Sequence, residues 1–298
     1  MRRLLLCSSL ALLPAFGMLM GVSSAANART VPKAPQTQAA QHAQHAQHAQ
    51  HAQHAQAAAS ALAAIKNLKI GQHQTDMRTG TISWVKALTQ EQSTNWSGYA
   101  DTGSNVTSIS GHWTEPSASC GSATSLDVFW VGIDGFSSGT VEQDGTGVEC
   151  VGGTPIFFSW WEMFPTNSIQ VVSESLRPGD SITASVVRSG TSYTLTVTDS
   201  TRGGVGFSTR QTCATCANNS AEWIAEAPSG SGGVEPLTNF GTWSLSGATV
   251  TEGTTRGVIS SFPDDEITMV NSAGQVKAQP GALNSSGNGF SVRWERST

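Results

Sequence analysis

Histidine is almost absent from the C-terminal two-thirds of this 298-residue chain, where His112 is the only one after residue 91. Nucleophilic serines and cysteines usually depend on a histidine base. Hydrolytic zinc sites usually use two or three imidazoles. The scarcity argues against a serine or cysteine hydrolase and against zinc-dependent hydrolysis, and we expect neither a metal nor another cofactor.

A G-x-S-x-G match at residues 135–139 does not restore a serine nucleophile. A nucleophile elbow needs a helix after the serine and a histidine later in the chain. Residues 140–143 instead have the character of a strand, and no histidine follows. We interpret 135–139 as a Gly/Ser turn between strands.

Basic residues are also scarce after residue 91, and the chain divides there into two parts of opposite net charge. Residues 1–91 carry eight Lys/Arg and two Asp/Glu, a net of +6, whereas residues 92–298 carry eight and nineteen, a net of −11; together these give −5. An acidic body has no basic face to neutralise phosphates, so we expect no nucleic-acid partner. Few charges also suit a protein that must stay folded in acid.

The N-terminus predicts export. Two arginines precede an apolar run from Leu4 to about Val22, which is followed by the A-x-A sequence at 26–28. This is the layout of a signal peptide, predicted here as residues 1–28. A membrane anchor is the alternative, but polar residues, Pro14 and Gly17 break the run and no second one follows. We expect a secreted protein with no membrane association.

Cysteine usage agrees with an oxidising compartment. Removal of Cys7 with the signal leaves four cysteines, which allow three pairings. We favour Cys120–Cys150 and Cys213–Cys216. A redox motif or half a zinc site is the alternative for the C-x-x-C spacing, but no βαβ pattern surrounds it and no second ligand cluster completes a metal shell.

Residues 29–91 do not have the pattern of a folded domain. Residues 41–56 repeat Gln-His-Ala, with histidines at 42, 45, 48, 51 and 54, and residues 57–68 favour a helix. The repeat is interpreted as a solvated spacer, with a pH sensor and metal scavenging as alternatives. We predict a propeptide over 29–91, attracted to the acidic body and acting as its inhibitor.

From residue 92 onward the sequence predicts a single all-β domain. Short apolar segments are bounded by Gly, Ser, Asn, Thr and Pro, and almost no helical period occurs. Residues 181–187 and 192–197 have the pattern of a hairpin. The expected fold is an antiparallel β-sandwich or jelly roll.

Carboxylates beside aromatic residues are the remaining candidates for chemistry. Glu162 lies in an aromatic strand, and Glu222, Ile224 and Glu226 should share one face of another strand. Two acids beside an isoleucine are costly to bury unless they face a cleft. Rim positions for the acids and core positions for the tryptophans are the alternatives, so these patterns alone leave open whether the protein is a hydrolase.

Six motifs occur over most of residues 93–298: NWSGY at 95–99, WVGIDG at 130–135, VEQDG at 141–145, WWEMFP at 160–165, RPGD at 177–180 and AEWIAE at 221–226. In this order they make the sequence similar to the glutamic peptidases, or eqolisins, including bacterial relatives of the fungal enzymes. The resemblance implies a concanavalin-like sandwich of two antiparallel sheets with a substrate groove on a concave face.

The resemblance also implies the site. The catalytic glutamine maps to Gln143 and the catalytic glutamate to Glu226, with Glu222 as the fallback base. Substrate-binding candidates are Trp130, Asp134, Glu162 and Glu222. The family's tyrosine two positions after the groove glutamate is Phe164 here, which leaves side-chain specificity open.

The implied activity is that of a pepstatin-insensitive acid endopeptidase, a monomer acting on proteins or peptides. Glu226 would serve as general base and then general acid, and Gln143 would donate to the oxyanion. A β-sandwich glycoside hydrolase using Glu162 and Glu226 is one alternative. A non-catalytic carbohydrate-binding module, in which the tryptophans matter and the pair does not, is the other.

Overall fold

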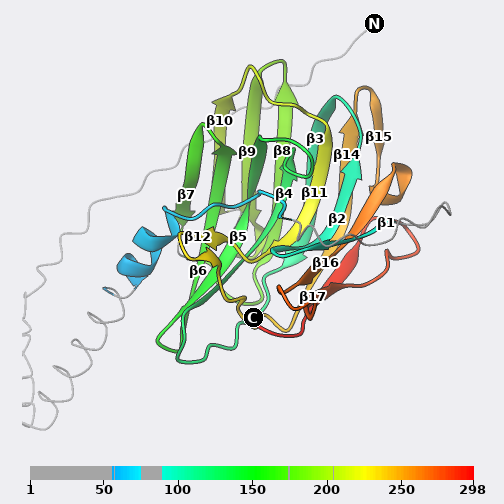
Figure 1. The fold of residues 1–298 in the computed structure, drawn as a ribbon. Helices are drawn as coiled ribbons and strands as arrows, with labels where there is room; N and C mark the ends of the chain where they lie inside the picture. Colours follow the sequence, from blue (N-terminus) through cyan, green and yellow to red (C-terminus); the bar gives the residue numbers. More distant parts are fainter. Residues whose placement is uncertain (1–55, 57, 75–88, 174, 204) are drawn as a thin grey trace, which may run out of the picture. The chain divides into compact units, whose positions relative to one another are not determined.

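The computed structural model describes residue 56 and residues 58–74, 89–173, 175–203 and 205–298, all within one compact unit spanning 49–298 (Figure 1). The expected signal peptide and the five repeat histidines lie outside the described residues. Within the described part, no helix is long and apolar enough to cross a membrane. Residues 58–65 are helical, inside the segment 57–68 that the sequence predicted as helical, and residue 56, just before that segment, is helical too.

The body is built of strands. They are β1 (Thr89–Ser93), β2 (Trp96–Thr102), β3 (Val106–Thr114), β4 (Ser125–Ile133), β5 (Val141–Val151), β6 (Thr154–Phe164), β7 (Asn167–Ser173), β8 (Ser181–Ser189), β9 (Ser192–Asp199), β10 (Val205–Thr212), β11 (Ser220–Glu226), β12 (Ser229–Gly230), β13 (Gly233–Val234), β14 (Thr242–Glu252), β15 (Thr255–Gly257), β16 (Asp264–Val270), β17 (Val276–Pro280) and β18 (Phe290–Trp294), with 3-10 turns η1 (Ser200–Arg202) and η2 (Ile259–Ser261).

The strands form one continuous hydrogen-bonded sheet that folds over itself. Its order is β10-β9-β8-β3-β14-β18-β17-β16-β2-β11-β4-β5-β6-β7, with β1 parallel to β16, β15 on β14, and β12–β13 as a separate hairpin (Figure 1). Strands that are distant in this order pack face to face. For example, Phe129 of β4 stacks on Trp243 of β14 with ring centroids 5.2 Å apart. The all-β antiparallel prediction is confirmed, as is the β8–β9 hairpin.

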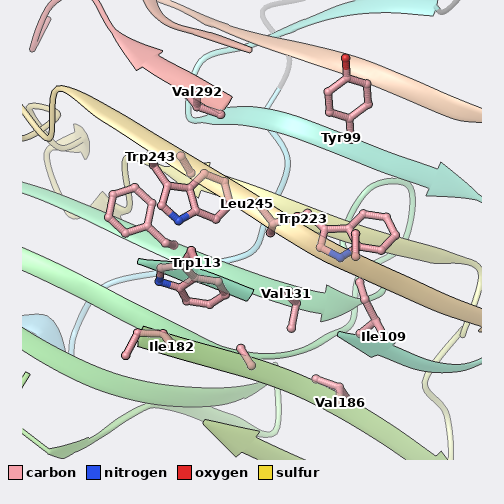
Figure 2. Close-up of a cluster of buried hydrophobic side chains, with 14 of the residues drawn as sticks. Tyr99, Ile109, Trp113, Val131, Ile182, Val186, Trp223, Trp243, Leu245 and Val292 are labelled. Carbon is pink, nitrogen blue, oxygen red and sulfur yellow. The ribbon is translucent and has the colours of Figure 1, made fainter. Parts of the chain in front are cut away.

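The main core lies between the two layers. Trp113, Trp223 and Trp243 come from β3, β11 and β14 and are fully buried together (Figure 2). The Trp223 indole N–H also donates to the Ser110 carbonyl on β3, 2.9 Å away. Burial of such rings is among the largest single contributions to a core.

The opposite face of the β2–β11–β4–β5–β6 region carries a second apolar cluster. On β11, Trp223 belongs to the main core and Ile224 to this second cluster. Successive side chains of a strand point to opposite faces, so Glu222, Ile224 and Glu226 share the second face, as the sequence predicted. Leu62 and Ile65 of the N-terminal helix are buried in the same cluster.

Both predicted disulfides are present. Cys120 and Cys150 are joined with Cα atoms 5.4 Å apart, and Cys213 and Cys216 with Cα atoms 5.7 Å apart. The first bond ties the loop before β4 to the end of β5.

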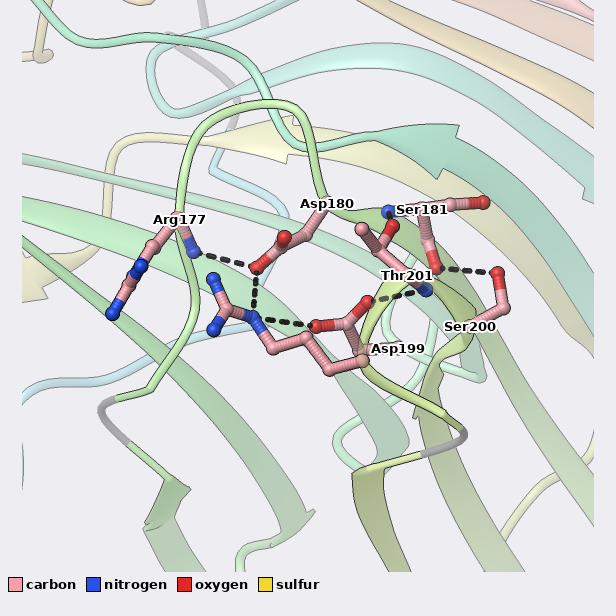
Figure 3. A network of polar contacts seen from close by, with 7 residues as sticks. Arg177, Asp180, Ser181, Asp199, Ser200 and Thr201 are labelled. Atoms are coloured by element: carbon pink, nitrogen blue, oxygen red, sulfur yellow. Dashed lines mark hydrogen bonds and ion pairs between the residues drawn. The ribbon is translucent and has the colours of Figure 1, made fainter.

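The RPGD motif is structural. The Asp180 carboxylate accepts the Arg177 main-chain N–H at 2.8 Å and the Arg202 guanidinium at 3.0 Å, and Arg202 also lies 3.3 Å from Asp199 (Figure 3). Burial raises the pKa of Asp180, but these hydrogen bonds and the guanidinium charge outweigh it and leave the pKa below its usual value. The network fixes the start of β8 to the η1 turn.

Candidate active site

Glu226 and Gln143 lie on the second face, on strands separated only by β4. Glu226 pairs with Val128 of β4 and Gln143 with Gly132. Trp130 stands between those two β4 positions and, by the period of two, points to the same face. The register therefore places the acid, the indole and the amide in one row.

A glycine at position 132 permits this close packing. A Cβ there would lie 2.7 Å from the Trp130 ring and 3.2 Å from the Gln143 Cβ. Any side chain would displace the indole or the amide, so Gly132 is required where they meet.

Glu226 accepts hydrogen bonds from three groups. The Trp130 indole N–H donates to Oε2 at 2.9 Å and the Asn95 side-chain amide to Oε1 at 3.1 Å. The main-chain N–H of Gly71 lies 2.9 Å from Oε2 and 3.2 Å from Oε1. All three donors favour the ionised form.

Burial raises the pKa of Glu226 by more than these hydrogen bonds lower it. The carboxyl is fully buried, which raises its pKa from 4.5 to about 8, although the bonds from Gly71, Trp130 and Asn95 oppose the rise. Part of that burial comes from the chain segment containing Gly71.

Gln143 is held by Glu162. Its Nε2 donates to Glu162 Oε2 at 2.8 Å between paired positions of β5 and β6. Burial first, and then the Glu226 charge, raise the pKa of Glu162 well above its usual value. Glu162 therefore lies beside Gln143 and sets the orientation of its amide, and the predicted contact of Glu162 with substrate stays a prediction.

Residues 68–74 run across this row of side chains. Lys69 forms an antiparallel bridge with Ser229, with N–O distances of 2.8 and 3.0 Å. Ile70 is fully buried in the second apolar cluster. Farther along, the Gln74 carbonyl accepts the Thr94 N–H at 2.8 Å. The segment is thus anchored on both sides of Gly71.

Gly71 itself lies between the two predicted catalytic residues. Its φ of +78° is in the region that favours glycine. A Cβ at this position would lie 2.2 Å from Nε2 of Gln143. With its N–H on Glu226 and its Cα against Gln143, Gly71 covers both.

His73 occupies an aromatic slot beside the row. Its ring stacks on Phe136 at 5.0 Å and 18° and lies 5.0 Å from Trp96 at 39°. Burial lowers the pKa of His73 from 6.5 to about 4, although a hydrogen bond with the Phe136 main chain opposes the fall. The slot thus favours a neutral ring.

Two other predicted site residues lie apart from the pair. The Asp134 carboxylate accepts the Asn218 and Asn219 main-chain N–H groups at 2.7 and 2.8 Å and so joins two loops. Glu222 is four residues before Glu226 on β11, about 13 Å at the rise of a strand, and burial raises its pKa well above the usual value. Their predicted substrate contacts remain predictions.

One cluster of a glutamate and two cysteines has the spacing of a metal site but lacks the free ligands. Glu142 lies near Cys213 and Cys216, but both sulfurs are in a disulfide and offer no thiolate. Residues 135–139, interpreted as a Gly/Ser turn between strands, do lie in the connection from β4 to β5.

Sequence reasoning missed four members of the site: Gly71, His73, Asn95 and Phe136. Asn95 is the first residue of the NWSGY motif, but no function was predicted for it from the sequence. The available signal for Gly71 was that it is the first glycine after the predicted helical segment 57–68; nothing in the sequence connects His73 with Phe136.

The fold and the row of side chains define a β-sandwich protein with a carboxyl and a carboxamide beneath a bound stretch of peptide. The Peptidase A4 family model matches residues 94–291, and the chain belongs to this family. The predicted resemblance to the glutamic peptidases is thereby confirmed.

Individual relatives are distant. Aspergillopepsin-2 of Aspergillus niger is 28% identical over 188 residues, covering 55% of this chain and 66% of the relative, just under two-thirds of its length. Scytalido-glutamic peptidase, solved with a transition state analog inhibitor, superposes with a TM-score of 0.59 at 23% identity over 68% of this chain and 98% of that chain. SCP-B, an eqolisin solved with the tripeptide Ala-Ile-His, gives 0.57 at 24% identity over the same shares. These structures show the common fold.

Proposed function

We propose that the chain is a secreted endopeptidase that hydrolyses protein and peptide substrates in acid, with Glu226 and Gln143 as its catalytic pair. The observation that carries this proposal is the segment 68–74, a stretch of peptide seated across both side chains with a main-chain N–H on Glu226. Membership of the Peptidase A4 family implies peptide-bond hydrolysis and supports the reaction class.

Glu226 can supply both proton transfers, and Gln143 can supply the hydrogen bond to the oxyanion. Glu226 as carboxylate takes a proton from water while the water oxygen bonds to the carbonyl carbon. The carbonyl electron pair moves to oxygen, and a Gln143 N–H donates to the oxyanion, an interaction worth about 3 kcal/mol. Glu226 then returns the proton to nitrogen as the C–N bond breaks, leaving a carboxylic acid and an amine.

Gln143 can serve in this way without leaving Glu162. Its amide nitrogen has two N–H groups, one of which remains on Glu162 while the other faces the substrate. The Glu162 contact also prevents rotation of the amide, so the donor is in place before the reaction begins.

Acidic activity requires that Glu226 ionise below neutral pH. In the covered state, burial raises its pKa to about 8. Departure of the segment admits water and removes part of that burial, while Trp130 and Asn95 still donate to the carboxylate. We expect the pKa in the open enzyme to be lower for this reason.

Residues 29–91 would then be a propeptide that inhibits until acid releases it and the enzyme cleaves it off, a step called processing, and residues 1–28 would be its secretion signal. The support for inhibition is geometric, because Gly71 lies where the substrate and water would bind. The opposite net charges of residues 1–91 and 92–298 also favour attachment near neutral pH.

Digestion of a denatured protein by the full chain tests the proposal. The chain is acidified, and cleavage is followed at about pH 3.5 and pH 7, on either side of the usual glutamate pKa, with pepstatin present. Variants are Glu226→Gln, Gln143→Ala and Glu222→Gln, the last of which tests the fallback base on the same strand face. We expect cleavage in acid alone, abolished by the first two changes; cleavage that persists in Glu222→Gln would keep the base at Glu226.

Other outcomes identify the alternatives. Loss with Glu222→Gln and not with Glu226→Gln would move the base by four residues. Retained glycan cleavage in Gln143→Ala would indicate a glycoside hydrolase. Absence of any cleavage by the fully processed chain would refute the peptidase.

A further inference from the structure

Asn95 is fixed directly beside the base. It precedes β2, whose first residue pairs with Glu226, and its carbonyl accepts the Ala227 main-chain N–H at 2.9 Å. The residue is 1% exposed. Its backbone position is therefore determined by the same strand end that carries Glu226.

The Asn95 side-chain amide binds the main chain of the seated segment at two points. Its Nδ2 donates to the Gln72 carbonyl at 2.8 Å, and its Oδ1 accepts the Gln74 N–H at 3.0 Å. In an extended peptide, the carbonyl of one residue and the N–H of the residue two positions later lie on the same edge. Every peptide offers the same carbonyl and N–H whatever its side chains, unless proline stands at the position of Gln74 and removes the N–H.

The same amide contacts the base and its own support. Nδ2 also donates to Glu226 Oε1 at 3.1 Å, and the Ser93 hydroxyl lies 2.9 Å from Oδ1. A carboxamide has two N–H groups and two acceptor lone pairs, and these four contacts use them all. The donors face Gln72 and Glu226 and the acceptor faces Gln74, which sets the orientation of the amide.

We propose that Asn95 is a peptide-binding and positioning residue, which binds the substrate main chain at two positions and holds the Glu226 carboxylate with the same nitrogen. This rests on the proposed function and adds a link between substrate seating and the base. The segment 68–74 serves as the example of this contact, because any extended substrate presents a carbonyl and an N–H like those of Gln72 and Gln74.

One consequence concerns glycosylation. Asn95-Trp96-Ser97 matches the acceptor sequence N-x-S, but the Asn95 nitrogen is buried and both its N–H groups are used. A glycan at this nitrogen is incompatible with the folded site.

Kinetics of Asn95→Asp and Asn95→Ala in the acid-processed full chain test the proposal. Asn271→Asp is the matched control, because Asn271 makes comparable turn contacts between β16 and β17 and gains the same charge. We expect kcat/KM to fall at least tenfold in both Asn95 variants, with KM raised, and to stay unchanged in Asn271→Asp. In Asn95→Asp the added carboxylate should also move the acidic limb of the kcat/KM profile to higher pH, a change that a purely structural role would not cause.

Hydrogen exchange of the unprocessed chain near pH 7 separates this inference from the proposed function. Asn95→Asp keeps the acceptor for the Gln74 amide and should preserve its protection, whereas Asn95→Ala should lose it by at least tenfold. Equal protection in both variants, or kcat/KM within twofold of wild type with an unmoved profile, would overturn the assignment. If the wild-type chain cleaves nothing, the proposed function fails, and the Gln74 amide still decides whether Asn95 binds peptide.

Discussion

The main-chain N–H of Gly71 lies 2.9 Å from Oε2 of Glu226, a residue 155 positions later in the chain. This contact connects the N-terminal segment directly with the predicted base. Glu226 and Gln143 are therefore covered by this segment, and each neighbour of the segment can be tested separately.

Gly71→Ala should release the segment. A Cβ would lie 2.2 Å from the Gln143 amide and would also strain a backbone at φ +78°. We expect processing to begin at higher pH, with the segment bound at least tenfold more weakly. The measurement is the pH at which half of the chain has been processed.

The control for Gly71→Ala is Gly274→Ala, which has a φ of +75° and open space around the site of the Cβ. It imposes similar strain without the clash. Equal pH midpoints in the two variants would show that Gly71 has no special part in latency.

His73→Phe should retain the segment at lower pH. The pKa of His73 is about 4 in the slot and 6.5 in the usual case, so neutral His73 contributes binding that is present above about 6.5 and lost as pH falls towards 4. Glu226 has the opposite effect on binding of the segment. Its pKa is raised to about 8 when it is covered, so protonation of Glu226 favours the covered state as pH falls. Comparison with wild type isolates the imidazole, because phenylalanine keeps the stacking and cannot be charged.

The readout for His73→Phe is again the pH midpoint of processing. We expect it to move down. A variant with the five repeat histidines changed to Gln tests the earlier sensor hypothesis in parallel, and a shift in that variant alone would assign the sensor to the repeat.

Glu162→Gln should retain most activity in acid, and Glu162→Ala should lose at least tenfold in kcat. Because burial and the Glu226 charge raise the pKa of Glu162, it is neutral in acid, and glutamine has nearly the same shape. Alanine leaves the Gln143 amide free to rotate. Comparable activity of the two variants at pH 3.5 would exclude an orienting role.

The fold should be most stable in acid. Burial, followed by neighbouring acidic charges, raises the pKa of Asp101 from 3.8 to about 9 and that of Glu142 from 4.5 to about 10. Their protonated forms stabilise the native state below about pH 4, and this contribution is lost as pH rises towards those values, by up to about 1.4 kcal/mol per group and pH unit. Urea unfolding at pH 4 and pH 8 measures the difference.

Glu142→Gln provides the internal check on that pH dependence. Its neutral amide has no proton to lose, so the variant should unfold less readily than wild type at pH 8 and show a flatter profile. An unchanged slope would mean that Glu142 does not contribute.

Strand periodicity made much of the site predictable. The alternation of β11 placed Glu226 and Ile224 on one face and Trp223 on the other, because a strand repeats every two residues. The motifs of the family located Gln143, which composition alone would have passed over. Both disulfide pairs were also recovered, one of them from a spacing of three residues.

The all-β class, the family and the faces of individual strands follow from the sequence alone, since they depend on local periods and short motifs. The three-dimensional arrangement was needed to place Gly71 over Glu226, His73 between Trp96 and Phe136, and Asn95 against both the segment 68–74 and Glu226. Those contacts join segments separated by up to 155 residues, and no local period specifies where a distant segment crosses a strand.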